Sequence, residues 1–120
     1  MQIWIHAPKG FRPSNWVDML RDIDVAFELD PHLVDPCFIT VNEEKHYVLF
    51  VMCSLLDEGL PQAEVREALF QEMMAKAASL GLKVTVPHEF AATYPRWWSW
   101  LEPYCREKRI ELNTHEAVRP

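Results

Sequence analysis

Residues 61–86 read PQAEVREALFQEMMAKAASLGLKVTV, and this stretch predicts a helix that is followed at once by a strand. Its apolar residues recur at the spacing of one helix face: Val65, Leu69, Met73, Ala77 and Leu80. Pro61 is suited to opening a helix and Gly81 to closing one. Glu72 and Lys76 stand one turn apart, in the orientation that favours an ion pair. After Gly81 the residues alternate between apolar and polar, which predicts a strand over 82–86.

Two elements at the N-terminus continue the pattern. Residues 2–6 alternate as a strand, with Ile3 and Ile5 on one face and Trp4 and His6 on the other. A helix follows, because four apolar residues recur at steps of three and four, while Asp18, Arg21 and Asp22 are expected to face solvent. The four are Trp16, Leu20, Ile23 and Phe27. The helix begins either with Pro13 at its first position or with Ser14 as its N-cap, and the sequence leaves both open.

The middle of the chain predicts a hairpin. Residues 38–41 and 46–52 are strand-like, and the polar residues 42–45 form the loop between them. Residues 30–37 contain two Asp-Pro pairs and predict a connection. The order strand, helix, strand, strand, helix, strand then predicts an α+β domain of the ferredoxin-like βαββαβ type over residues 1–90. We expect a four-stranded antiparallel sheet with both helices on one face.

Residues 91–120 predict a Trp-rich helical tail and not an independent domain. Its helix is expected to begin at Pro95, and the last residues, 113–120, are expected to be frayed. The strand over 46–52 is apolar on both sides, so the helix-free face of the sheet, with Trp4, Leu49 and Val51, needs a cover. That cover is either the tail, with Trp97 and Leu101 directed at the sheet, or a second copy of the chain in a homodimer.

Composition bounds the function. The chain has 120 residues, 18 acidic against 12 basic, and a formal net charge of −6, so nucleic acid is an unfavourable partner. No apolar run is long enough to span a membrane and no secretory signal is visible, so a cytoplasmic protein is expected. The three cysteines, Cys37, Cys53 and Cys105, form no CxxC pair and are expected to be buried, inert thiols.

No catalytic, cofactor or metal motif is present. The five histidines have no metal-ligand spacing, and three glycines cannot build a phosphate-binding loop. The leading hypothesis is therefore a small interaction or regulatory module, with a protein partner or a second copy, that is not an enzyme and needs no cofactor. The alternative is a small-ligand sensor or enzyme with a pocket between the open sheet face and the tail. That pocket would be lined by Trp4, His6, Arg12 and Trp98.

Residues 11–16, FRPSNW, resemble the FRPS-x-W opening of a small bacterial family of unknown function. Residues 35–41 resemble that family's proline-containing second strand, residues 48–51 its third strand, and residues 80–84 its last helix–strand junction. Family members more often carry Asp where this chain has Asn15, and they end near the fourth strand, before the tail. The resemblance covers residues 3–86 and implies a ferredoxin-like fold, with no activity assigned.

The resemblance singles out Arg12, for which two roles are open. Arg12 either forms an ion pair with a neighbour such as Asp18 or clamps an anion at the start of the first helix.

Overall fold

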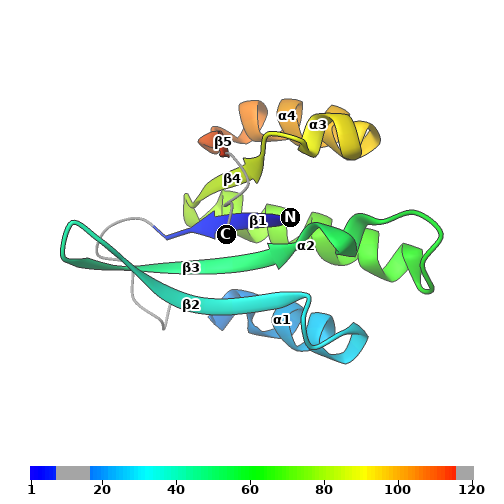
Figure 1. The fold of residues 1–120 in the computed structure, drawn as a ribbon, viewed down its shortest axis with the longest axis horizontal. Coiled ribbons are helices and arrows are strands. Elements are labelled where there is room, and N and C mark those ends of the chain that lie inside the picture. The colour runs from blue at the N-terminus through cyan, green and yellow to red at the C-terminus, as the bar shows by residue number, and fades with distance from the viewer. Residues whose placement is uncertain (8–16, 116–120) are drawn as a thin grey trace.

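The computed structural model describes residues 1–7 and 17–115, apart from the side chains of residues 17–20, 39, 41 and 115. Within this part of the chain, one five-stranded sheet has the order β2-β3-β1-β4-β5 (Figure 1). The strands are β1 (Gln2–His6), β2 (Val34–Val41), β3 (Glu44–Met52), β4 (Lys83–Pro87) and β5 (Leu112–His115). The helices are α1 (Val17–Leu29), α2 (Ala63–Leu80), α3 (Phe90–Thr93) and α4 (Pro95–Lys108), with a 3-10 turn, η2 (Cys53–Leu56). The protein is a small mixed α+β domain, and no described helix is long and apolar enough to cross a membrane.

The strand directions make the sheet mixed. β1 lies between β3 and β4 and is antiparallel to both, and β2 is antiparallel to β3. β5 is parallel to β4. The four predicted strands are therefore present, but the prediction of a four-stranded, wholly antiparallel sheet is wrong. Residues 113–115 are also not frayed, because α4 carries the chain back to the edge of β4, where β5 pairs with β4.

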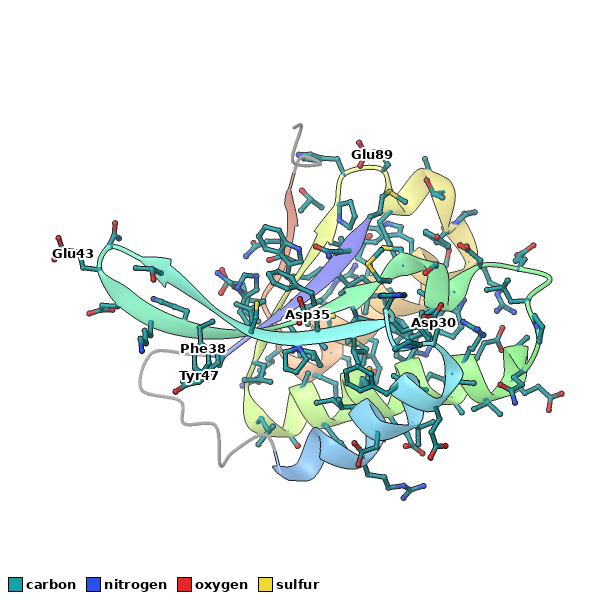
Figure 2. The ribbon with its side chains drawn as sticks, turned by 60° about the horizontal axis from the view of Figure 1, so that its bottom comes forward. Asp30, Asp35, Phe38, Glu43, Tyr47 and Glu89 are labelled. Carbon is teal, nitrogen blue, oxygen red and sulfur yellow. The ribbon has the colours of Figure 1, made fainter. Side chains whose placement is uncertain are left out.

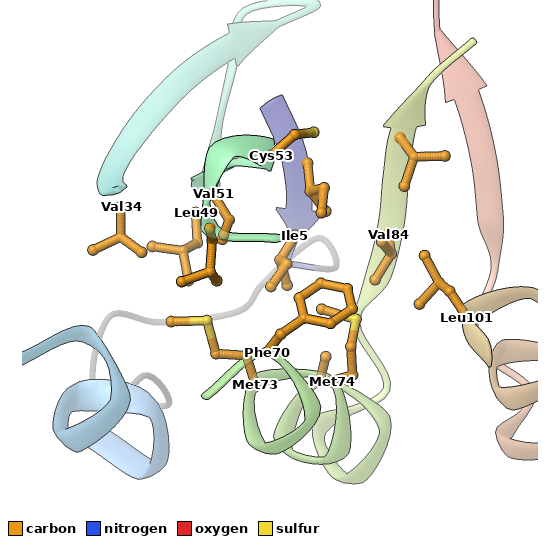
Figure 3. Packing of buried hydrophobic residues seen from close by; sticks show 14 of the residues in the cluster. Ile5, Val34, Leu49, Val51, Cys53, Phe70, Met73, Met74, Val84 and Leu101 are labelled. Atoms are coloured by element: carbon orange, nitrogen blue, oxygen red, sulfur yellow. The ribbon is translucent and has the colours of Figure 1, made fainter. Parts of the chain in front are cut away.

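The helices gather on one face of the sheet. The strands β1 and β2, β3 and β4, and β4 and β5 run parallel to each other. Crossover connections between parallel strands are almost always right-handed, and with this strand order that rule places α1, α2 and α4 on the same side. Figure 3 shows α2 in the middle of this layer, with Phe70 and Met73 directed at the strands. Ile5, Leu49 and Val84 meet them from the sheet, and all five side chains are fully buried. The two predicted helices on one face are confirmed, and α4 joins them.

The predicted position of the tail is wrong. α4 packs beside α2 and not on the helix-free face: the ring of Phe70 lies 5.2 Å from that of Trp97 and 5.9 Å from that of Trp100. Leu101 and Cys105 are buried in the same core. β5 runs parallel to β4 and lies beyond it at the edge of the sheet. A right-handed crossover from β4 to β5 therefore places α4 on the same side as α2, and the tail extends the helical layer.

The register between β1 and β3 also corrects the expected composition of the helix-free face. Trp4 is opposite Phe50, whereas Ile3 is opposite Val51 and Ile5 is opposite Leu49. Leu49 and Val51 therefore belong to the core side, and Phe50 lies with Trp4 on the helix-free side.

The buried face of α1 differs from the apolar stripe. Asp22, expected in solvent, is 1% exposed, whereas Phe27, expected in the core, is 41% exposed. The reason is an ion pair between helices, in which Lys76 Nζ of α2 lies 2.8 Å from Asp22 Oδ2. Among the ion pairs of the described residues, Lys76 therefore pairs with Asp22 and not with Glu72. The alternative helix starts at Pro13 and Ser14 lie outside the described residues.

The hairpin is tighter and longer than predicted. Asn42 and Glu43 alone form its turn, both with positive φ (51° and 67°), as a two-residue turn of the I′ type requires. β2 begins at Val34, inside the predicted connection, because Pro36 is tolerated in an edge strand. β1 pairs with residues 48–52 of β3 only, so the outer part of the hairpin, residues 38–47, projects as an arm (Figure 2).

Candidate functional site

A cavity of about 340 Å³ lies at the carboxyl end of β1, which we call the β1-end cavity. Four described segments contribute to it: the end of β1, the start of β3, the turn from α2 into β4, and the connection from α4 to β5. Its lining residues are His6, Ala7, His46, Gly81, Leu82, Lys83, Arg109 and Glu111. The volume is at the lower end of the range for small-molecule sites.

Backbone pairing positions the cavity walls. The Ala7 amide donates to the Tyr47 carbonyl at 3.0 Å, which joins the end of β1 to the start of β3. The Val84 amide donates to the Glu111 carbonyl at 2.9 Å, which ties the connection after α4 to β4. Gly81, with φ of 70°, ends α2 in a left-handed conformation that lets the chain turn sharply into Lys83. These bonds hold the lining residues on a rigid frame.

His6 lies on the helix-free side of the cavity. It is opposite Lys83 in the register between β1 and β4, and its Nε2 is hydrogen-bonded to Thr85 Oγ1 at 2.9 Å. Its ring centroid is 5.8 Å from that of Trp4. The imidazole is therefore held in place and shares the cavity with a cationic neighbour.

The cavity is cationic, although the chain carries a net charge of −6. Among the described lining residues, Lys83 and Arg109 contribute two positive charges against one negative charge, that of Glu111, with two histidines beside them. Glu111 Oε1 accepts a bond from Asn113 Nδ2 at 3.3 Å. Among the described residues, no ion pair involves Lys83 or Arg109. Arg and Lys with this freedom bind carboxylates and phosphates.

A second hollow, of about 400 Å³, lies between η2 and the start of α4. Two of its polar groups are joined to each other, because the Tyr94 hydroxyl donates to Asp57 Oδ1 at 2.5 Å, and its Arg96 forms an ion pair with Glu67 of α2. Burial and the bond to Asp57 raise the pKa of Tyr94. These groups stabilise the α4 docking, so we place the candidate site at the β1-end cavity.

The residues predicted to line one pocket do not meet. Trp4 and His6 are neighbours on the helix-free face, as expected. Trp98 belongs to α4 on the other side of the sheet, where its ring lies 6.2 Å from that of Phe90. A pocket between the helix-free face and the tail is therefore excluded by the position of α4. Arg12 lies outside the described residues.

The cysteines do not supply a nucleophile to this cavity. Burial raises the pKa of Cys53 to about 12 and that of Cys105 to about 11, and burial with the charge of Asp35 raises that of Cys37. Thiols shifted in this direction stay protonated near neutral pH. Across residues 1–7 and 17–115, no three His, Cys, Asp or Glu side chains converge as a metal site would require.

The helix-free face beside the cavity is only partly apolar. Trp4 and Phe50 pack edge to face with their centroids 5.5 Å apart, and both are half-buried. Thr85 and Lys83 share this face. The rings shield each other, so among the described residues this face does not present the large apolar surface that was expected to need a cover. The most exposed large apolar side chain in the described part of the chain is Phe38, at 58%.

Comparison with known proteins returned no matching family model, no matching curated protein and no matching solved structure. The resemblance to the FRPS-x-W family stays a prediction.

Proposed function

We propose that this protein is a small-ligand-binding module and that its ligand carries an oxyanion, either a carboxylate or a phosphate, bound in the β1-end cavity. One observation carries the proposal: Lys83, Arg109, His6 and His46 converge on one cavity in a chain that is acidic overall. An anion there would gain charge-assisted hydrogen bonds from several donors at once.

The two cations also have a structural reason to be at this position. Arg109 is the C-cap of α4, and Lys83 closely follows the end of α2, where positive charge opposes the negative end of the helix dipole. Arg109 nevertheless has φ of 59°, a left-handed conformation that costs an L-residue about 1–2 kcal/mol and that glycine adopts freely. Glycine would therefore serve at least as well as arginine if Arg109 were only a helix cap. Replacing Arg109 by glycine thus distinguishes a capping role from an anion-binding role.

Phosphate and sulfate are expected to raise the thermal stability of the wild type above that in chloride at equal ionic strength. At about 100 times its dissociation constant, an anion adds roughly 2.7 kcal/mol to the free energy of unfolding. Arg109→Gly is expected to remove this gain while changing the stability without anion by less than about 1 kcal/mol, because relief of the backbone offsets loss of the dipole contact. Lys83→Gln should remove the gain as well. Thermal unfolding followed by circular dichroism measures both quantities.

The matched control is Lys108→Gln, which removes the same charge one residue before Arg109 from a side chain that is exposed and outside the cavity. Lys108→Gln should keep the full anion response. Equal stabilisation by phosphate and chloride in the wild type, or an unchanged response in Arg109→Gly, would contradict the proposal.

We also infer that β1-α1-β2-β3-α2-β4 is a ferredoxin-like unit, to which α3, α4 and β5 add a further crossover. The strand order β2-β3-β1-β4 and the antiparallel direction of these neighbours support it.

A second candidate function, an interaction module that forms a homodimer, is favoured by the arm. Phe38 is 58% exposed there, its ring 4.5 Å from that of Tyr47 (Figure 2), and no described strand pairs with the outer edge of β2. An unpaired edge rich in Phe, Ile, Thr and Val is a template for a second strand. Two copies could pair through β2 about a twofold axis.

For this candidate, sedimentation equilibrium is expected to show a concentration-dependent dimer that Phe38→Ser disperses. Phe50→Ser is the matched variant on the helix-free face, because the sequence predicts a homodimer through that face. Dispersal by Phe50→Ser instead of Phe38→Ser would assign the dimer to that face. A wild type that stays monomeric at all concentrations would contradict both forms of the homodimer.

A further inference from the structure

His6 belongs to two surfaces at once. It lines the β1-end cavity beside Lys83, and it stands in the helix-free face next to Trp4, with 5.8 Å between the ring centroids. Trp4 in turn contacts Phe50 at 5.5 Å. The cationic cavity is therefore continuous with a short row of aromatic rings, which we call the aromatic row (Trp4 and Phe50).

The aromatic row lies on a rigid part of the molecule. β1 is the central strand, bonded on one side to β3 and on the other to β4. Thr85, 7% exposed, holds His6 by the bond to Nε2, and Val48, 1% exposed, is opposite His6 on β3. Both rings of the aromatic row are half-buried, so each has a fixed orientation and still presents some surface to solvent.

Resting on the proposed anion site, we propose that the ligand is an aryl phosphate or aryl carboxylate, with its anion in the β1-end cavity and its flat ring on the aromatic row. Side chains on one face of a strand repeat every second residue, about 7 Å apart, which sets the distance from the anion near His6 to the ring near Trp4. Aromatic side chains stack on flat rings, and cations beside them bind the attached oxyanion.

Charge and continuity favour this occupant over a protein partner. Lys83 lies at the border of the aromatic row, and the described lining of the β1-end cavity beside it has one excess positive charge. The row itself contains two rings, each partly shielded by the other. Two neighbouring rings beside one cationic cavity match a ligand with one ring system and one acidic substituent.

Isothermal titration calorimetry with three probes tests the proposal: inorganic phosphate, 1-naphthyl phosphate and cyclohexyl phosphate. We expect 1-naphthyl phosphate to bind about tenfold more tightly than inorganic phosphate, within the range that stacking on an aromatic side chain provides. Cyclohexyl phosphate, with an apolar but non-planar ring, should gain less.

Trp4→Leu is expected to lose the tenfold preference while keeping the affinity for inorganic phosphate, which also reports that the cavity is intact. Phe50→Leu is the second variant and should reduce the preference in the same way. Trp98→Leu is the matched control, because Trp98 lies on α4 against Phe90. Its preference should equal that of the wild type.

The outcomes separate this inference from the proposed function. If no probe binds, the anion site itself is wrong. If all three probes bind equally, or if Trp4→Leu and Phe50→Leu both keep the preference, the anion site stands and the aromatic row is not part of it.

Discussion

A chain that ends at Pro87 is expected to lose its cooperative fold. The deletion removes α4, whose Trp97, Leu101 and Cys105 are buried in the common core, and it removes β5 from the edge of β4. It also exposes Phe70, which is fully buried in the intact chain. Burial of each large apolar side chain contributes roughly 1.5–3 kcal/mol, and a whole domain has only about 5–15 kcal/mol of net stability.

Far-ultraviolet circular dichroism and binding of a hydrophobic dye measure this result. The control is a chain that ends at His115 and keeps every described helix and strand, and it should unfold cooperatively near the wild-type temperature. Trp97→Ala tests the same contact with one residue and should cost about 3–5 kcal/mol, as is typical for a buried tryptophan. A chain ending at Pro87 that unfolded with wild-type cooperativity would show that α4 is dispensable to the core.

Lys76→Met is expected to destabilise the protein by on the order of 2 kcal/mol. It leaves the carboxylate of Asp22, 1% exposed, without its partner at 2.8 Å between α1 and α2. Removing one partner of a fully buried pair typically costs about 3–5 kcal/mol. We expect less here because the Lys76 side chain is 29% exposed and the pair is partly screened by solvent.

The double variant Asp22→Leu with Lys76→Met should recover most of that loss, because an apolar pair of similar volume replaces the charges. Chemical denaturation of the two single variants and the double variant gives the coupling energy. Glu72→Gln is the control, since Glu72 was the partner expected from helical spacing alone, and it should change stability by less than about 0.5 kcal/mol. Additive effects of the two substitutions, or a loss from Glu72→Gln equal to that from Lys76→Met, would contradict the ion pair.

Local patterns predicted those elements whose signals lie within a few residues of each other. The periodicity of α2 and the glycine at its end placed a helix within two residues of its observed bounds, and the alternation of residues 2–6 placed β1. The signals for α2 and for β1 are local, because a capping glycine acts on the last turn of its own helix and the alternation acts within a single strand. The alternation of residues along β1 is also sufficient to predict which side chains lie on the helix-free face. It places Trp4 and His6 on the same face, where the structure has them as neighbours.

The misses have a common physical cause, which is dependence on distant partners. The helical pattern places Asp22 on the solvent-facing side of α1, and its burial depends on Lys76 of another helix, which pairs with it. Residues 112–115 carry a weak strand signal and pair only because α4 returns them to β4. Asn42 and Glu43 adopt positive φ although neither is glycine, so the tight turn had little local signal.

The sequence predicts only part of the candidate site, because most of its residues come together through contacts between distant segments. His6 was singled out by its face and its neighbour, but His46, Lys83 and Arg109 come from three other segments. No spacing in the chain relates these positions to one another. Only the register of β1 with β3 and β4, and the path from α4 to β5, brings them to one cavity.

The central place of β1 has a consequence for how the chain is made. β1 precedes the other described strands in the chain and completes its pairing only when β4 is available, and the bond between His6 and Thr85 spans 79 positions of the sequence. Loop closure of that length makes folding slow compared with a protein of local contacts. Until then, Ile3 and Ile5 belong to an apolar strand with an unpaired edge, the kind of segment that mispairs with other nascent chains. Residues 2–6 must therefore be delivered to their place between β3 and β4 late in folding, a requirement on their sequence that is separate from any contact with the proposed ligand.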